Sequence, residues 1–303
     1  MQSAMKWVAV ALVFGVASMA RAGDFADEVS HEFADSDGVK IHYAKAGEGP
    51  LIVFIHGFPD YWYTWRKQME GLAGDYTVAA LDTRGYNKSD KPEGVENYDM
   101  RFLVGDVAAV IKNEGLDKAI IVGHDWGGVI AWSFAATMPE MTDKLVILNL
   151  PHPAGLVREL KNNPQQHANS AYARRFQEPD SHNSINAAAL AGMLSQGDAD
   201  LRAKYTEAFE NSSTDAMMNY YRANYPRAPY EGGIADIPNI KASVLQFHGL
   251  EDSALLPEGL NNTWDHLEKD WTLVTLPGVG HWSQRDASDT ITDTMKWWLK
   301  THE

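Results

Sequence analysis

The stretch IIVGHDWGGV, residues 120–129, combines the end of a strand, a sharp turn and the start of a helix. Its first residues are apolar and mostly β-branched, as in a buried strand. Gly123 and Gly127 then flank Asp125 in the pattern Gly-x-Asp-x-Gly, which is typical of a nucleophile elbow. The flanking positions require glycine because a side chain at either would collide with the turn. The central residue of such a turn is commonly serine, so a carboxylate at this place calls for a chemical explanation.

Strand-like and helix-like segments alternate on both sides of this stretch. A hairpin strand at 39–47 opens the series, and the segment 100–114 carries apolar residues at helical spacing. Short continuous apolar runs of this kind predict strands that are buried on both faces of a parallel sheet. The alternation therefore predicts an α/β fold with helices on both faces of the sheet. The remaining predicted strands are 51–57, 76–82, 118–125, 144–150, 243–252 and 271–281.

The strand pattern stops after Leu150 and returns near residue 237. The region between carries helical patches such as ALAGMLSQ and TDAMMNYYRANY. A loop of this length without structure of its own would be unusual in a compact domain. We therefore expect a helical cap, 151–236, inserted between two parts of one core, 23–150 and 237–303.

The amino-terminal segment 1–22 has the pattern of an export signal. Lys6 precedes an apolar run at 7–20, and an Ala-Arg-Ala sequence ends at Ala22. The run is shorter than the roughly 20 apolar residues that a transmembrane helix needs. We expect cleavage after Ala22 and a periplasmic or secreted mature chain that is not bound to the membrane, with an uncleaved anchor as the alternative.

The composition excludes several classes of function. The formal net charge is −15, which argues against a general affinity for nucleic acid or anionic membrane surfaces. The chain has no cysteine, so thiol catalysis, disulfides and cysteine-ligated metals are excluded. Neither a cluster with metal-ligand spacing nor a glycine-rich phosphate loop stands out. We expect no metal and no cofactor.

Candidate partners for Asp125 follow it along the chain. Asp252 ends a predicted strand in HGLED, and His281 follows another in PGVGH. Nucleophile, acid and histidine thus come in the order that a nucleophile elbow requires, at the carboxyl ends of parallel strands. The backbone N–H groups of Phe58, in HGFPD, and Trp126 are the expected oxyanion donors.

A carboxylate nucleophile suits displacement at a saturated carbon. Attack by serine there would leave an ether, whereas attack by Asp125 leaves an ester of the enzyme's own side chain. Water activated by His281, which Asp252 orients and stabilises, can cleave that ester. The expected reaction on a small-molecule substrate is therefore the opening of an epoxide or the displacement of a halide.

The motifs HGFP, GHDWGG and GHWSQ together resemble those of α/β-hydrolases, in the branch of epoxide hydrolases and dehalogenases. The resemblance extends over essentially the whole mature length. It implies an α/β-hydrolase fold with a mostly parallel eight-stranded sheet flanked by helices, and a helical cap inserted after strand six.

In epoxide hydrolases two cap tyrosines donate to the epoxide oxygen, a role for which a phenol is suited because it stays protonated at neutral pH. The segments YARRFQEPD and NYYRAN resemble the family segments that carry them. This resemblance assigns the donors to Tyr172 and Tyr221, with Tyr220 the less favoured neighbour. The residues expected to bind substrate are Phe58, Trp126 and Phe176.

Secreted bacterial epoxide hydrolases of the Cif type pair a cap histidine with a tyrosine and take their acid from the position after strand six. Tyr172 and Asn149 stand at those two places here. The resemblance therefore favours a two-tyrosine enzyme whose acid is Asp252.

Each dehalogenase alternative requires a substrate- or halide-binding residue that this sequence does not have. Haloalkane dehalogenases combine the tryptophan after the nucleophile with an asparagine or a second tryptophan, and Phe58 stands where that asparagine would be. Fluoroacetate dehalogenases carry arginines at the places held here by Trp126 and Val129. We expect an epoxide hydrolase that forms a vicinal diol. A dehalogenase and a ligand-binding protein on the same fold are the alternatives, and self-association of the chain is left open.

Overall fold

The computed structural model describes residues 24–302. The predicted export signal, 1–22, lies outside these residues, so cleavage and export stay predictions. Of the helices within the described range, none is both long and apolar enough to cross a membrane.

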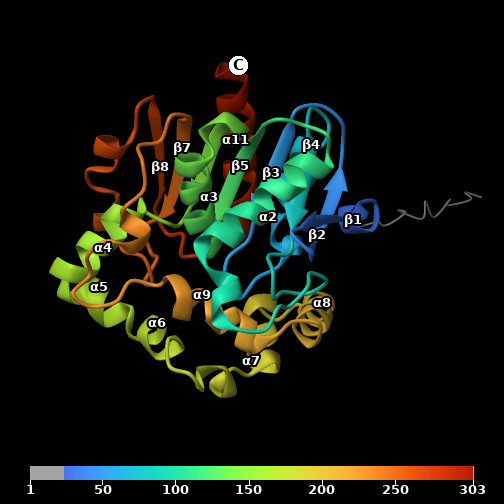
Figure 1. The fold of residues 1–303 in the computed structure, drawn as a ribbon. Coiled ribbons are helices and arrows are strands. Elements are labelled where there is room, and N and C mark those ends of the chain that lie inside the picture. Colours follow the sequence, from blue (N-terminus) through green and yellow to red (C-terminus); the bar gives the residue numbers. More distant parts are fainter. Residues whose placement is uncertain (1–23, 303) are drawn as a thin grey trace, which may run out of the picture.

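An eight-stranded sheet forms the centre of the molecule (Figure 1). The strand order is β1-β2-β4-β3-β5-β6-β7-β8, with β2 antiparallel to both of its neighbours and all other pairs parallel. The predicted mostly parallel sheet of eight strands is thereby confirmed. The strands are β1 (Ser30–Ser36), β2 (Val39–Ala46), β3 (Leu51–Ile55), β4 (Thr77–Leu81), β5 (Ala119–His124), β6 (Thr142–Leu148), β7 (Ser243–Gly249) and β8 (Trp271–Leu276).

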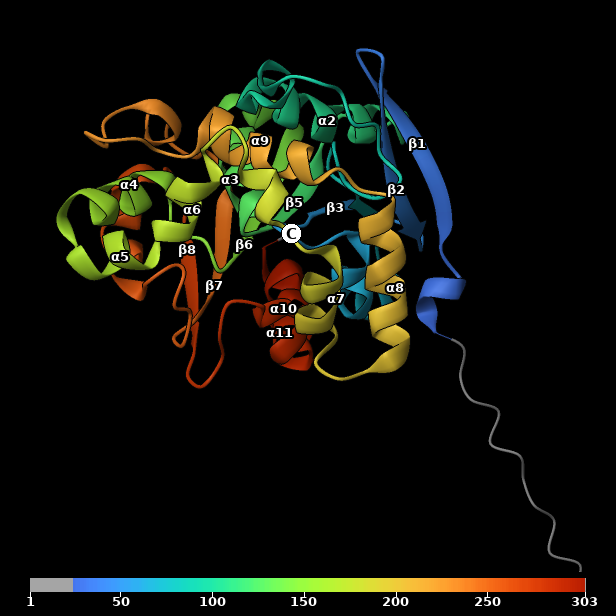
Figure 2. The same cartoon turned by 90° about the horizontal axis from the view of Figure 1, so that it is seen from below.

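Helices cover both faces of this sheet (Figure 1 and Figure 2). Strands β3, β4 and β5 are buried along their whole length, as parallel strands between two helical layers should be. Helices α2 and α3 lie on one face, and α1 and α11 pack together on the other. The core helices are α1 (Arg66–Leu72), α2 (Met100–Asn113), α3 (Trp126–Thr137), α10 (Ser283–Asp286) and α11 (Ser288–Thr301).

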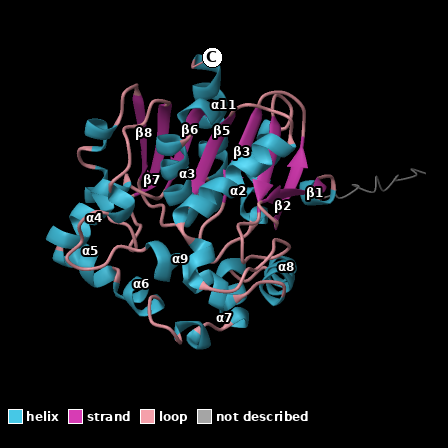
Figure 3. Cartoon of the chain, in the orientation of Figure 1, coloured by secondary structure: helices cyan, strands magenta, loops and turns pink. Residues whose placement is uncertain are grey.

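The segment between β6 and β7 is helical, which confirms the predicted insertion after the sixth strand (Figure 3). It lies beyond the carboxyl ends of the parallel strands, with α4 to α6 toward β7 and β8 and with α8 toward β2 (Figure 1 and Figure 2). Its helices are α4 (Pro153–Asn162), α5 (Pro164–Asn169), α6 (Ala171–Phe176), α7 (Ala187–Ser195), α8 (Ala199–Glu210) and α9 (Thr214–Asn224).

The turn between β5 and α3 holds Asp125 in a rare backbone conformation, with φ +52° and ψ −122°. Non-glycine residues seldom adopt positive φ, and such strain persists only where the surroundings enforce it. Tight packing supplies that enforcement, because a Cβ atom at Gly123 would collide with the carbonyl of Gly127. One at Gly127 would collide with the carbonyl of Ile55. The glycines of the motif therefore allow β3, β5 and α3 to approach closely enough to form the elbow.

We predict that Gly127→Ala lowers the free energy of unfolding by about 1–3 kcal/mol, the usual cost of forcing an atom into a packed site. The added Cβ would meet backbone, which has little freedom to move away. Urea unfolding followed by circular dichroism measures the change. The matched control is Gly74→Ala, since a Cβ at Gly74 meets nothing within 4 Å. Equal stability of the two variants would contradict this account of the elbow.

Candidate active site

Asp125 lies at the start of α3 with one carboxylate oxygen already in the expected oxyanion hole. The backbone N–H of Phe58 donates to Asp125 Oδ1 at 2.7 Å, and the backbone N–H of Trp126 also hydrogen-bonds this carboxylate. Burial by itself would raise the pKa of Asp125. The interactions with His281 and the N–H group of Trp126 outweigh it and hold the pKa below its usual range. Asp125 is therefore ionised at neutral pH.

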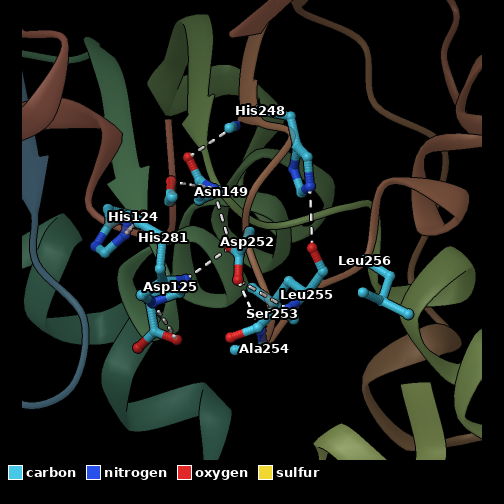
Figure 4. A network of polar contacts seen from close by, with 12 residues as sticks. His124, Asp125, Asn149, His248, Asp252, Ser253, Ala254, Leu255, Leu256 and His281 are labelled. Atoms are coloured by element: carbon cyan, nitrogen blue, oxygen red, sulfur yellow. Dashed lines mark hydrogen bonds and ion pairs between the residues drawn. The ribbon is translucent and has the colours of Figure 1, made fainter. Parts of the chain in front are cut away.

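The structure brings His281 between two carboxylates (Figure 4). Its Nδ1 lies 2.8 Å from Asp252 Oδ2, and its Nε2 lies 3.6 Å from Asp125 Oδ2. Burial alone would lower the pKa of His281, but the charges of Asp252 and Asp125 outweigh it and raise the pKa well above the usual value. The imidazole therefore stays protonated as long as both carboxylates carry their negative charge.

Asp252 lies in the turn after β7, because that strand ends at Gly249 and not at Asp252 as the sequence pattern predicted. Its Oδ1 accepts hydrogen bonds from the backbone N–H groups of Ala254 and Leu255, at 2.8 and 3.0 Å. An aspartate that bonds to backbone groups two and three residues ahead stabilises a turn rather than a strand. The same bonds leave Oδ2 directed at His281 (Figure 4).

Asn149 is a functional residue that the sequence analysis missed. The sequence shows only that Asn149 stands where the Cif-type enzymes have an acid. In the structure its side-chain amide donates to Asp252 Oδ2 at 2.9 Å and to the carbonyl of Gly280 at 3.2 Å. Its Oδ1 accepts the N–H of Gly249 at 3.3 Å. One buried amide thus connects the ends of β6 and β7 with the loop that carries His281. The available signal was an asparagine immediately beyond a buried strand, where asparagine tolerates the observed φ of +43°.

Two buried histidines support the site without facing substrate. His124 Nε2 donates to the carbonyl of His281 at 2.9 Å, and burial lowers its pKa to about 3, so it is neutral. His56 accepts the N–H of Thr83 through Nε2 at 3.0 Å and hydrogen-bonds the Gly57 carbonyl through Nδ1. It thereby holds the loop that presents the N–H of Phe58.

The two predicted cap tyrosines come from different helices, Tyr172 from α6 and Tyr221 from α9. Their ring centroids are 6.4 Å apart at an angle of 76°. Tyr221 also contacts the rings of Phe58 and Trp126, at 5.7 and 5.0 Å, and therefore lies over the oxyanion loop and the elbow. Burial, with a further contribution from Asp125, raises the pKa of each tyrosine well above 10, so both stay protonated donors.

Phe176 lies against both tyrosines, at 5.6 Å from the Tyr172 ring and 5.1 Å from the Tyr221 ring. Its ring also contacts Phe58. The residues predicted to bind substrate are therefore part of one aromatic wall. Tyr220 is not available as a donor to substrate, because its hydroxyl donates to the carbonyl of Arg84 at 2.8 Å.

Within residues 24–302, no group of three or more His, Asp or Glu side chains is placed to hold a metal ion.

The model of the alpha/beta hydrolase fold family matches residues 50–288 of this chain. The chain is 33% identical to Epoxide hydrolase 1 of Caenorhabditis elegans, over 88% of this chain and 69% of that protein. It is 34% identical to an AB hydrolase superfamily protein of Bacillus subtilis, over 90% of this chain and 99% of that protein. A crystal structure of an epoxide hydrolase from Bacillus megaterium, in complex with an inhibitor, superimposes with a TM-score of 0.83 at 30% identity, covering 89% of this chain and all of that one. These matches extend over core and cap together.

We predict that Asp252→Asn lowers the pKa of His281, because the substitution removes one of the two negative charges that stabilise the imidazolium. The deprotonation of His281, followed by NMR of the labelled imidazole, should move to lower pH. Asp270→Asn is the control, since Asp270 pairs with His302 and not with His281. An unchanged titration of His281 in Asp252→Asn would contradict the assignment of its charge partner.

Proposed function

This chain belongs to the α/β-hydrolases, in the branch that contains the epoxide hydrolases, and from that premise we propose that it adds water to an epoxide to give a vicinal diol. The observation that carries the proposal is the position of the two protonated tyrosines over the carboxylate. Tyr221 contacts Phe58 and Trp126, whose N–H groups bind Asp125, and Tyr172 lies beside Tyr221. Both tyrosines are thus close enough to Asp125 to feel its charge, which supports their role as acids for the same substrate.

In the first step the two oxygens of Asp125 have different roles. Oδ1 is held by the N–H of Phe58, which leaves Oδ2 to attack a carbon of the epoxide. A bond forms between Oδ2 and that carbon while the carbon–oxygen bond of the ring breaks. The electron pair moves to the epoxide oxygen, which takes up a proton through Tyr172 and Tyr221. The product is a hydroxyalkyl ester of Asp125.

Ester formation changes the protonation of His281. The ester is neutral, so one of the two negative charges that raise the pKa of His281 disappears. The pKa falls, and the proton that His281 loses replaces the one that the tyrosines give to the epoxide oxygen, so the step takes up no net proton. The histidine is therefore converted from a cation into a base when a base is needed.

In the second step neutral His281 takes a proton from water, and the water oxygen attacks the Cγ carbon of the Asp125 ester. Negative charge develops on Oδ1, which already accepts the N–H of Phe58, while the N–H of Trp126 bonds the same carboxylate. The intermediate then collapses, the bond to the alkyl oxygen breaks, and that oxygen takes the proton from His281. Diol leaves, and the remaining carboxylic acid of Asp125 gives its proton to His281, which restores the carboxylate and the imidazolium.

A structure of a Bacillus megaterium epoxide hydrolase variant contains its product, (R)-3-[1]naphthyloxy-propane-1,2-diol. That protein is 31% identical to this chain with a TM-score of 0.83. Aryl glycidyl ethers, the epoxides that give such diols, are therefore the first substrates to test. The aromatic wall of Phe58, Phe176 and Tyr221 supports this choice.

We predict that His281→Gln accumulates the ester, because the carboxylate of Asp125 can still attack while no base activates water. Mass spectrometry of the digested protein should find the mass of the epoxide added to the peptide that contains Asp125. Asp125→Ala is the control and should carry no adduct. Diol formation at the wild-type rate by Asp125→Ala would refute the covalent mechanism.

We predict that Tyr172→Phe and Tyr221→Phe each slow ring opening by about 10²-fold or more, the range that a positioned general acid contributes. Single-turnover kinetics with a glycidyl ether measures the step. Tyr220→Phe should open the ring at close to the wild-type rate, because the hydroxyl of Tyr220 is bound to the Arg84 carbonyl. Halide release from chloroalkanes, with no turnover of epoxides by the wild type, would instead indicate a dehalogenase.

A further inference from the structure

In the proposed reaction, the distance between the side chains of Tyr172 and Tyr221 must be kept constant. Both must reach the same epoxide oxygen, yet they lie on α6 and α9, which are separate in the chain. Helix α6 has only six residues, Ala171–Phe176. A helix of this length does not hold its own conformation in water, so contacts with its surroundings must determine where Tyr172 lies.

The first such contact comes from Gln177, the residue that follows α6. Its side-chain amide donates to the carbonyl of Tyr225 at 2.8 Å and to the carbonyl of Tyr221 at 3.3 Å. The carbonyls at the end of a helix lack some or all of their usual helical partners, although that of Tyr221 also accepts the backbone N–H of Tyr225 at 3.1 Å. Gln177 thus binds the end of α9 at the turn that carries the second tyrosine.

The second contact runs in the opposite direction, from Arg222 on α9. Its guanidinium donates to the carbonyls of Pro179 at 2.7 Å and Glu178 at 3.3 Å, in the segment just beyond α6. The same group is held on α9 by Asp215 and Asn219, at 2.7 and 2.8 Å. A planar guanidinium fixed in this way presents its remaining donors in one direction.

We propose that Gln177 and Arg222 are positioning residues that form a reciprocal clamp and set the distance between the two acid tyrosines. Gln177 is five residues beyond Tyr172, and Arg222 is next to Tyr221. Gln177 donates to the backbone of α9 at Tyr221, and Arg222 donates to the backbone just beyond the helix that carries Tyr172. The ring of Phe176 packs beside both tyrosine rings, so the clamp holds α6 and α9 together around a cluster of three rings.

The clamp acts on one step of the reaction, and it rests on the function proposed above. Ring opening needs both hydroxyls at the epoxide oxygen, and a misplacement of about 1 Å can cost about 10²-fold in rate. Ester hydrolysis depends on His281, Asp252 and the oxyanion donors, all of which belong to the core. Loosening the clamp should therefore slow the first step and leave the second unchanged.

The test measures both steps in Gln177→Glu, which keeps the shape of the side chain but replaces the donor amide by a carboxylate facing two carbonyls. Single-turnover kinetics with a glycidyl ether should show ring opening slowed by about 10-fold or more, with ester hydrolysis at the wild-type rate. After many turnovers in ¹⁸O-labelled water, the position of the label in the diol reports which epoxide carbon is attacked, because each ester cleavage leaves a water oxygen on Asp125 that a later epoxide receives. The ratio of the two labelled positions should also change. Gln165→Glu is the control, because the Gln165 amide bonds only to Asn169 within α5.

A second pair of variants distinguishes the loss of these hydrogen bonds from the loss of the folded structure. Gln177→Met removes the donor without adding charge, and Arg222→Lys keeps the charge but cannot reach both carbonyls. Each should slow ring opening selectively while thermal unfolding stays cooperative. Arg202→Lys, at an exposed site on α8, is the control for the arginine.

Unchanged ring opening in all three clamp variants would overturn the proposal. An equal loss in both steps would overturn it as well, since that is the result of a general structural role. A wild type that opens no epoxide would overturn the proposed function and the clamp's catalytic role with it. Wild-type turnover combined with unaffected variants would overturn the clamp alone.

Discussion

The whole site depends on the backbone strain at Asp125. A positive φ at a non-glycine residue is unfavourable, and it persists here because β3, β5 and α3 pack too closely for the chain to relax. That conformation directs one carboxylate oxygen at the N–H of Phe58 and the other toward His281. The two oxygens therefore have different surroundings, and in the proposed reaction one becomes the oxyanion and the other is the nucleophile.

The electrostatics follow from this placement. A single histidine between two carboxylates is a stable cation, and such a cation cannot act as a base. In the proposed reaction, alkylation of Asp125 removes one of the two charges, so the covalent step itself creates the base for the next step. The cap contributes the complementary chemistry. Burial raises the pKa of Tyr172 and of Tyr221, and the negative charge of nearby Asp125 raises it further, so both tyrosines stay protonated.

Much of the fold was predictable because it depends on local patterns. Buried parallel strands are short apolar runs, the elbow needs glycine at two fixed places, and the cap is visible as a break in the strand rhythm. Asn149 was not predictable in its role, since its amide joins segments that are far apart in sequence. The same holds for Gln177 and Arg222, which bind backbone carbonyls. Every residue type has a backbone carbonyl, so such a hydrogen bond cannot be predicted from the identity of the residue that accepts it.

The sequence by itself determined which groups the site contains: an aspartate at the centre of an elbow, followed along the chain by an acid and a histidine, from which we propose a reaction at saturated carbon. Side-chain identity and chain order are sufficient for that conclusion. Only the tertiary structure decided which oxygen of Asp125 is held, that Asp252 lies in a turn, and how two tyrosines from separate helices meet above the carboxylate. These features depend on distances between segments remote in the chain, and such distances are set by packing of the whole core and cap.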